Sequence, residues 1–159
     1  MSLTAEEIVA AVREHVSAES MFDLERLRAT LVEDVRYEIM APRYPDDPTP
    51  YGIFTGADTY LDMWRNLRDT FSSYEIDIEE VVPSPESNQA LVIINATATP
   101  RRDWRDLKAG MPMRWWAAAV IRFNQSGEML SETVYGSLPP TMAGLDRMME
   151  FAAIARTEE

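Results

Sequence analysis

The chain has 159 residues, of which 46% are apolar, and this is the size and composition of one folded domain with a substantial core. It contains no cysteine, which excludes disulfides, thiolate nucleophiles and cysteine-ligated metals. Its 27 acidic and 15 basic residues give a net charge of −12, so we expect neither nucleic acid nor an anionic membrane surface as a partner.

The start of the chain, residues 1–7, lacks the basic segment and apolar run of a signal peptide. No apolar stretch approaches the ~18 residues that a membrane-spanning helix needs. There is also no internal repeat and no low-complexity linker. We therefore expect one cytoplasmic domain over residues 1–159.

The first predicted helix begins at Thr4, because a threonine followed three residues later by Glu7 is typical of a capping box. One face of this helix is apolar apart from a histidine and a glutamate; its members are Ile8, Val12, His15, Val16 and Glu19. Asp23 is suited to cap a second, short helix, and a first strand is predicted over residues 35–40.

Residues 41–50 contain four prolines, which exclude a helix or a central strand and predict an extended loop at the rim of the fold. A third helix is predicted from Gly56 to about Phe71. The strands expected after it are 74–79, 90–99, 113–123 and 128–137, with a hairpin turn at 124–127. A terminal helix is expected after Pro139 and Pro140.

Two of these strands, 90–99 and 113–123, are apolar on both faces. Such strands need cover on both sides, and a second subunit is the simplest cover for the face that the helices leave open. The order of elements predicts an α+β fold in which a curved antiparallel sheet wraps around helices and encloses a mostly apolar pocket. We expect that pocket to bind an apolar small molecule.

Several short segments resemble the nuclear-transport-factor-two-like superfamily, above all its SnoaL-like polyketide cyclases and its ketosteroid isomerases. The resembling segments are 22–27, 31–35, 56–61 and 121–132. The resemblance implies a cone-shaped half-barrel with a deep pocket, often a homodimer through the outer face of the sheet, and the predicted terminal helix is an extra C-terminal helix on that fold.

The resemblance also implies where catalytic groups would lie. The isomerase general base falls on or beside Ile39 and its hydrogen-bond-donating acid near Ala119, while the cyclase aspartate falls near Ser137. None of these residues has a carboxyl group, so the usual chemistry of either family is not expected. The oxyanion-hole tyrosine of the isomerases falls at His15, where a proton-handling group is present.

His15 and Tyr37 are therefore the first catalytic candidates, with Tyr37 on the same strand face as Ile39. The alternative for His15 is a structural histidine paired with a carboxylate such as Glu19. Asp103 is a third candidate, because Arg101-x-Asp103 resembles the arginine–aspartate pair of limonene epoxide hydrolases. A charged hairpin tip is the favoured alternative for that segment.

Substrate-binding candidates are apolar, aromatic or hydroxyl-bearing residues expected near the pocket: Ile39, Tyr51, Trp64, Trp115, Ala119, Tyr135 and Ser137. Strand alternation predicts that Trp115 and Trp116 face opposite sides of the sheet, and Trp115 faces inward if Ala119 does. One histidine, no cysteine, no calcium-loop spacing and no glycine-rich phosphate loop predict neither a metal nor a cofactor.

Two functions remain open. The first is a SnoaL-like enzyme that performs cofactor-free cyclisation, isomerisation or hydration/dehydration on an apolar, oxygenated substrate such as a polyketide, terpenoid or steroid-like compound. The second is a non-catalytic ligand-binding protein or structural subunit, because residues 33–37 with Pro42 and Arg43 are similar to small subunits of ring-hydroxylating dioxygenases. The missing carboxylates favour the second function, and His15 favours the first.

Overall fold

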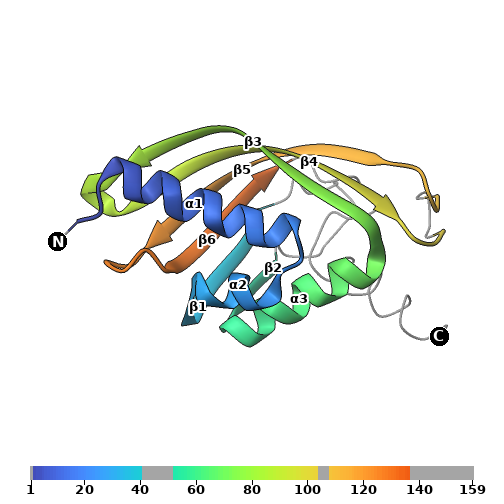
Figure 1. The fold of residues 1–159 in the computed structure, drawn as a ribbon, viewed down its shortest axis with the longest axis horizontal. Coiled ribbons are helices and arrows are strands. Elements are labelled where there is room, and N and C mark those ends of the chain that lie inside the picture. Colours follow the sequence, from blue (N-terminus) through green and yellow to red (C-terminus); the bar gives the residue numbers. More distant parts are fainter. Residues whose placement is uncertain (1, 41–51, 104–107, 137–159) are drawn as a thin grey trace.

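The computed structural model describes residues 2–40, 52–103 and 108–136, which form three α-helices packed on one six-stranded sheet (Figure 1). The helices are α1 (Ala5–Ser20), α2 (Leu24–Ala29) and α3 (Ala57–Thr70), and a 3-10 turn, η1, spans Pro85–Ser87. The strands are β1 (Leu31–Met40), β2 (Gly52–Thr55), β3 (Phe71–Ser84), β4 (Gln89–Pro100), β5 (Met113–Phe123) and β6 (Met129–Gly136). The predicted α+β fold is confirmed.

Helix α1 begins as the sequence predicts. The Thr4 hydroxyl accepts a hydrogen bond from the Glu7 backbone N–H, and the Glu7 carboxylate accepts one from the Thr4 N–H, so the capping box is complete. The buried face of α1 packs against β3 and β4 and includes Ile8 and Val12, neither of which is exposed. This packing also carries the two polar residues of that face, His15 and Glu19, into the interior.

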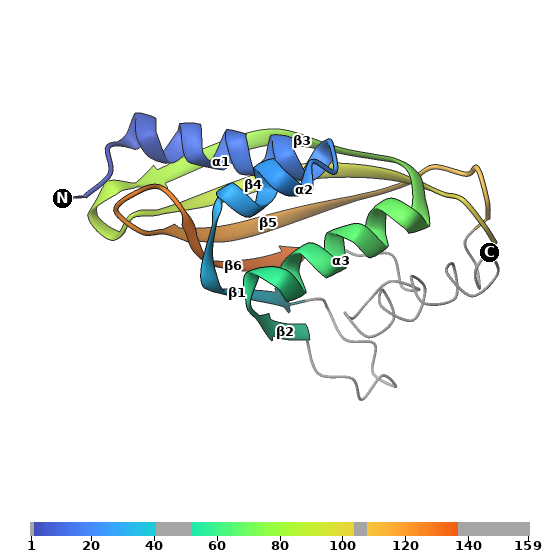
Figure 2. The ribbon, with the colours of Figure 1, turned by 60° about the horizontal axis from the view of Figure 1, so that its bottom comes forward.

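The strands lie in the order β2-β1-β6-β5-β4-β3, and the helices cover the concave face of the curved sheet (Figure 2). Strands β3 to β6 form the predicted antiparallel meander. The prediction of a wholly antiparallel sheet is wrong at one place, because β1 pairs with β6 in parallel. After β2, helix α3 leads to β3 at the opposite edge of the sheet, and the meander then brings β6 back beside β1. Because no hairpin links β1 and β6, they can pair in parallel.

Other differences lie at element boundaries. Strand β2 was not predicted, because four residues beside a proline-rich segment are too few to show a strand pattern. Strand β1 begins at Leu31 rather than Val35, and β3 follows α3 directly at Phe71. The predicted loop at 41–50 and the predicted terminal helix lie outside the described residues.

A β-bulge at Leu130 changes which residues of β6 face inward. Phe123 pairs with Met129 and Arg122 pairs with Ser131, so Leu130 is an extra residue between two pairs. Met129 and Glu132 are consequently both buried, although strict alternation from Met129 would direct Glu132 outward. The bulge therefore places a carboxyl group on the concave side of the sheet.

Trp115 is buried and Trp116 is 54% exposed, which confirms the predicted alternation on β5. On the outer face, the exposed apolar side chains of Val82, Leu91 and Tyr135 come from three further strands. No helix in the described part of the chain combines the length and apolar character needed to cross a membrane.

Candidate functional site

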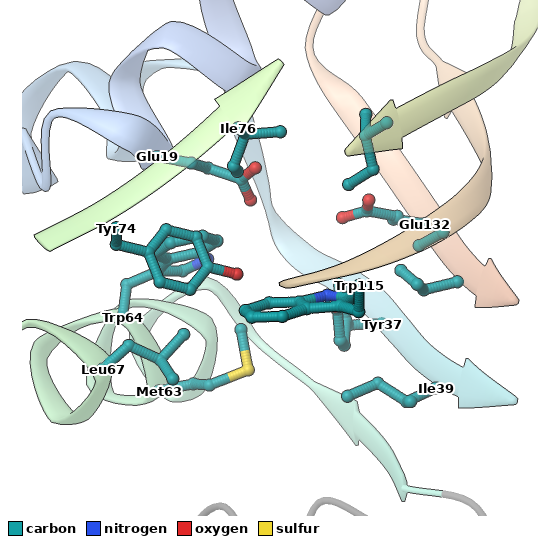
Figure 3. A pocket seen from close by; sticks show the side chains of 13 residues that line it. Glu19, Tyr37, Ile39, Met63, Trp64, Leu67, Tyr74, Ile76, Trp115 and Glu132 are labelled. Carbon is teal, nitrogen blue, oxygen red and sulfur yellow. The ribbon is translucent and has the colours of Figure 1, made fainter. Parts of the chain in front are cut away.

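A cavity lies between the helices and the concave face of the sheet (Figure 3). Its walls are mainly aromatic and aliphatic; they consist of Glu19, Tyr37, Ile39, Met63, Trp64, Leu67, Tyr74, Ile76, Ile94, Trp115, Ala117, Glu132 and Val134. The space that the centres of water molecules can occupy is about 60 Å³, which holds several waters. Only two of the lining residues carry a charge-bearing group, and both are glutamates.

These two glutamates come from opposite walls. Glu19 projects from the last turns of α1 and Glu132 from β6, and Figure 3 shows their carboxyl groups pointing toward each other across the cavity. Their side chains lie almost entirely out of solvent, with 5% and 7% of each residue exposed. A buried carboxyl group without a partner is unstable, so their partners decide what they can do.

Tyr60, on α3, connects the two carboxyl groups. Its hydroxyl lies 2.5 Å from Glu19 Oε1 and 3.1 Å from Glu132 Oε2, and it is fully buried. It also lies 3.2 Å from His15 Nε2. One phenolic oxygen thus joins residues from α1, α3 and β6 in one hydrogen-bond network.

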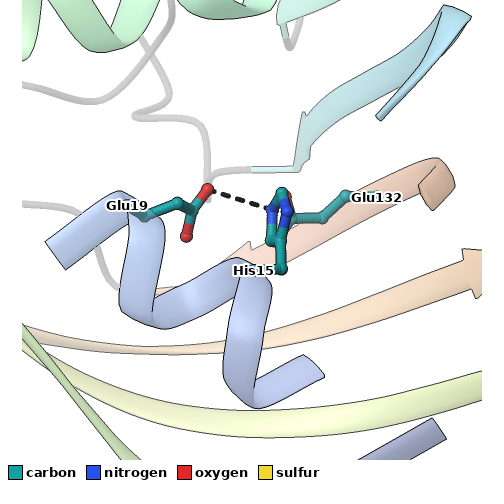
Figure 4. Close-up of side chains that lie close together, drawn as sticks. All are labelled: His15, Glu19 and Glu132. Carbon is teal, nitrogen blue, oxygen red and sulfur yellow. Dashed lines mark ion pairs between the residues drawn. The ribbon is translucent and has the colours of Figure 1, made fainter. Parts of the chain in front are cut away.

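His15 completes this network from behind the cavity wall. Its Nε2 lies 3.3 Å from Glu19 Oε1, an ion pair one helical turn apart that Figure 4 shows. Its Nδ1 lies 2.7 Å from the Thr30 hydroxyl. The histidine is 1% exposed and does not line the cavity, so it acts on the cavity only through its neighbours.

The number of hydrogens in the network determines its charge. The Tyr60 hydroxyl has one hydrogen and can donate it to only one carboxylate at a time, and the shorter contact is to Glu19. A second hydrogen bond between Tyr60 and Glu132 then requires a proton on Glu132, which donates to the phenolic oxygen. A protonated Glu132 beside a His15–Glu19 ion pair leaves the buried cluster neutral.

The pKa values shift in the directions that this arrangement requires. Burial, reinforced by the nearby charge of Glu19, raises the pKa of Glu132 to about 8. Burial alone would lower the pKa of His15, but the charge and hydrogen bond of Glu19 outweigh it and raise that pKa. Burial raises the pKa of both Tyr60 and Tyr37 well above the ordinary value, so both stay protonated and act as donors.

The aromatic walls hold Tyr60 and its neighbours in place. Tyr37 stacks on Phe54 with ring centroids 4.9 Å apart and meets Tyr60 edge-on at 5.2 Å. On the other side of the cavity, Tyr74 meets Trp64 and Trp115 edge-on at 5.4 and 5.9 Å. These stacked and edge-on contacts place aromatic rings on both sides of the two carboxyl groups.

The structure brings together part of the set predicted from sequence. Tyr37, Ile39, Trp64 and Trp115 line the cavity, and His15 adjoins it. Both catalytic candidates near the cavity are thus joined to the Tyr60 network, His15 by hydrogen bonding and Tyr37 by ring contact.

Other predicted residues lie elsewhere. Ala119 is buried in the core without lining the cavity, and Tyr135 lies on the outer face with 46% of its surface exposed, so its expected inward direction is wrong. Beyond the bulge, Glu132 and Val134 line the cavity, so Tyr135 faces outward by strand alternation. Asp103 is exposed, accepts a hydrogen bond from Lys108 at 2.7 Å and lies outside the cavity. Tyr51 and Ser137 lie outside the described residues.

Sequence reasoning missed the roles of Glu132 and Tyr60. Tyr60 occupies an apolar face of α3 at helical spacing, so its pattern is that of an ordinary core residue. The direction of Glu132 could not be predicted by strand alternation, because the bulge at Leu130 changes it. The one available signal was the pair His15 and Glu19 on an apolar helix face, because two buried polar groups at i and i+4 require a third partner across the core.

His15, Glu19 and Glu132 also lie close enough to share a metal ion, since one ligand atom from each lies within 4.8 Å of the others. The same three groups all contact the Tyr60 hydroxyl. Proton sharing is therefore the function that the observed contacts support directly.

Comparison with known proteins identifies this architecture. A family model described as a SnoaL-like domain matches residues 12–132. Among curated proteins, no match is found.

Several solved structures share the fold. An LEH-like epoxide hydrolase of M. tuberculosis is 12% identical, with 97% of this chain and 93% of that chain covered and a TM-score of 0.64. AclR, a candidate hydroxylase from Streptomyces galilaeus, is 16% identical over 92% and 98% of the chains, with a TM-score of 0.66. A candidate ketosteroid isomerase from Kribbella flavida is 18% identical over 85% and 81%, with a TM-score of 0.61.

The buried network predicts how stability depends on pH. The pKa of Glu132 is higher in the folded than in the unfolded chain, so the free energy of unfolding falls as pH rises from the ordinary value of 4.5 through about 8. The raised pKa of His15 acts in the same direction, because its stabilisation is lost as pH rises through the folded value. We expect a total loss on the order of 5 kcal/mol, because the pKa of Glu132 rises from 4.5 to about 8 and each pKa unit is worth about 1.4 kcal/mol.

Urea unfolding at about pH 5 and about pH 9, followed by tryptophan fluorescence, measures this loss. Glu132→Gln keeps the shape and removes the titrating proton, so it is expected to flatten most of the dependence. Glu80→Gln, at an exposed position on β3, is the matched control and is expected to keep the wild-type slope. Equal slopes in all three proteins would show that Glu132 titrates as an ordinary exposed glutamate.

Proposed function

Since this chain belongs to the family of SnoaL-like domains, we propose that it is an enzyme that performs cofactor-free proton-transfer chemistry on an apolar, oxygenated small molecule. One observation carries the proposal: two buried carboxyl groups face an aromatic cavity and share the hydroxyl of Tyr60 with a buried histidine. A purely structural cavity of this kind has no use for two carboxyl groups, because burying them costs stability.

In this proposal Glu132 is the general acid. A carboxyl group with a pKa of about 8 is largely protonated at neutral pH and can still release its proton to a substrate oxygen. Glu19, paired with His15, is the complementary base or charge stabiliser. Two carboxyl groups held in different protonation states can then remove a proton from one atom of the substrate and deliver one to another.

The aromatic walls supply the remaining requirements. Trp64, Tyr74 and Trp115 bind an apolar ring or chain and limit water in the cavity, which strengthens hydrogen bonds from Glu132 and from the Tyr37 hydroxyl. Cyclisation, isomerisation and hydration/dehydration all fit this set of groups. The solved structures of similar fold bear three different reaction names, so the fold alone does not select among them.

The test begins with the ligand. Wild-type protein is incubated with an extract of its source cells, and the retained small molecule is identified by native mass spectrometry. The ligand is then returned to wild-type and Glu132→Gln protein in D₂O and in H₂¹⁸O. Wild-type protein is expected to convert or label the ligand at least ~10²-fold faster than the variant, which is the usual contribution of a general acid.

Tyr60→Phe is a second variant, and Tyr135→Phe on the outer face is its matched control. We expect Tyr60→Phe to lose activity because it disconnects Glu132 from His15, and Tyr135→Phe to retain it. A ligand that both wild-type and variant proteins return unchanged and unlabelled would instead support a carrier. Co-purification with a larger protein would support the structural-subunit alternative.

We also infer that a second copy of the chain covers the outer face of the sheet. Val82, Leu91 and Val120 lie opposite one another across β3, β4 and β5, and the exposed side chains of Trp116 and Tyr135 lie farther along β5 and β6 on the same face. An exposed patch of this kind is a typical subunit interface.

Light scattering after size exclusion tests this interface. The wild-type protein is expected to be a dimer, and Trp116→Glu is expected to shift it toward the monomer by placing a charge in the interface. Met111→Glu is the control, since Met111 is also exposed but lies outside strands β3 to β6. A wild-type monomer at all accessible concentrations would contradict the inference.

A further inference from the structure

Thr30, the residue between α2 and β1, uses its single hydroxyl hydrogen in a local hydrogen bond to the backbone. The hydroxyl donates to the backbone oxygen of Leu27 at 2.7 Å, as the last turn of α2 ends. The same oxygen lies 2.7 Å from His15 Nδ1. Since Thr30 gives its hydrogen to Leu27, it can only accept from the histidine, and Nδ1 must carry the proton of that hydrogen bond.

The opposite edge of the ring faces the catalytic network. His15 Nε2 lies 3.2 Å from the Tyr60 hydroxyl and 3.3 Å from Glu19 Oε1. In the doubly protonated ring, Nε2–H donates to Glu19 and the Tyr60 hydroxyl is free to donate to Glu19 as well. In the singly protonated ring, Nε2 holds a lone pair, and the single Tyr60 hydrogen moves from Glu19 to Nε2. Both states suit the same ring position, so the histidine can change its charge without turning.

We propose that Thr30 is a positioning residue: by accepting the Nδ1–H of His15, it leaves Nε2 as the only ring atom that takes up or releases a proton toward Tyr60, Glu19 and Glu132. This inference deepens the proposed function and rests on it for its role in turnover. Protons then pass between the cavity and His15 at Nε2 alone, by way of Tyr60 and Glu19.

The groups that face His15 come from each element packed around it. Glu19 lies on α1, Tyr60 on α3, Glu132 on β6 and Thr30 after α2. Of these, only Thr30 contacts Nδ1 in the described contacts, and it does not titrate. The other tautomer, with hydrogen on Nε2, would place two lone pairs against each other at 2.7 Å.

The experiment uses the fact that His15 is the only histidine in the chain, so a histidine labelled with ¹⁵N gives one pair of ring signals. The ring is titrated in the wild-type protein to about pH 10, and the nitrogen that loses its proton is identified from its chemical shift. We expect Nε2 to lose its proton and Nδ1 to keep one. Loss from Nδ1, or a ring that stays doubly protonated throughout, would overturn the proposal.

Two variants test the role of Thr30 itself. Thr30→Val removes the acceptor at nearly constant shape, and it is expected to lower the pKa of His15 and to move hydrogen from Nδ1 to Nε2 in the neutral ring. Thr30→Ser keeps the hydroxyl and is expected to restore both signatures. An unchanged tautomer and pKa in Thr30→Val would show that Thr30 has no positioning role, and the wild-type titration stands even where that variant does not fold.

The ring signals do not depend on turnover, so this proposal and the proposed function can fail separately. Where the ligand assay shows turnover, Thr30→Val is expected to lower kcat by about tenfold with little change in KM, and Thr30→Ser to recover it within about threefold. A wild-type tautomer as expected, together with no turnover, would leave Thr30 as the residue that orients a non-catalytic histidine.

Discussion

The hydroxyl of Tyr60 is the contact on which the interior of this protein depends. It joins α1 through Glu19 and His15, α3 through its own backbone, and β6 through Glu132, and these elements lie far apart in the chain. Each carboxyl group would be less stable where it lies without this shared partner, because both are largely buried. The position of α3 against the sheet and the protonation of the cluster are therefore coupled, and a change in one must alter the other.

Neutrality of the cluster explains how a strongly acidic chain tolerates two buried glutamates. The net charge of −12 resides mostly on the surface, whereas the interior holds one ion pair and one protonated acid. The acid is poised near neutral pH by its surroundings and not by a specific cation, since burial is the largest cause of its shift. A bound ligand that excludes the remaining water would raise that pKa further, and a ligand oxygen that develops negative charge would receive the proton.

Features that depend on local spacing could be predicted from the sequence, whereas features that depend on sheet register and topology could not. The capping box at Thr4 and the opposite directions of Trp115 and Trp116 follow from spacing alone, and both are found. Glu132 could not be found that way, because a single extra residue in β6 reverses the alternation that starts from Met129. The resemblance placed a family acid near Ser137 on this strand, but the structure shows a buried carboxyl group earlier in it, at Glu132. The parallel pairing of β1 with β6 likewise depends on the whole topology and leaves no local signal.

The role of His15 illustrates why a candidate residue needs its contacts as well as its position. The sequence offered a general base or a structural histidine bound to Glu19, and the structure contains the contact that the second interpretation requires. That contact does not make the residue inert. Because His15 is fully buried behind the cavity wall, it cannot touch a ligand, yet both of its ring nitrogens meet a partner and one of those partners, Tyr60, reaches Glu132. A histidine held at Nδ1 and free to exchange a proton at Nε2 sets the charge that Glu19 and Glu132 experience, so its influence on chemistry in the cavity is electrostatic and indirect.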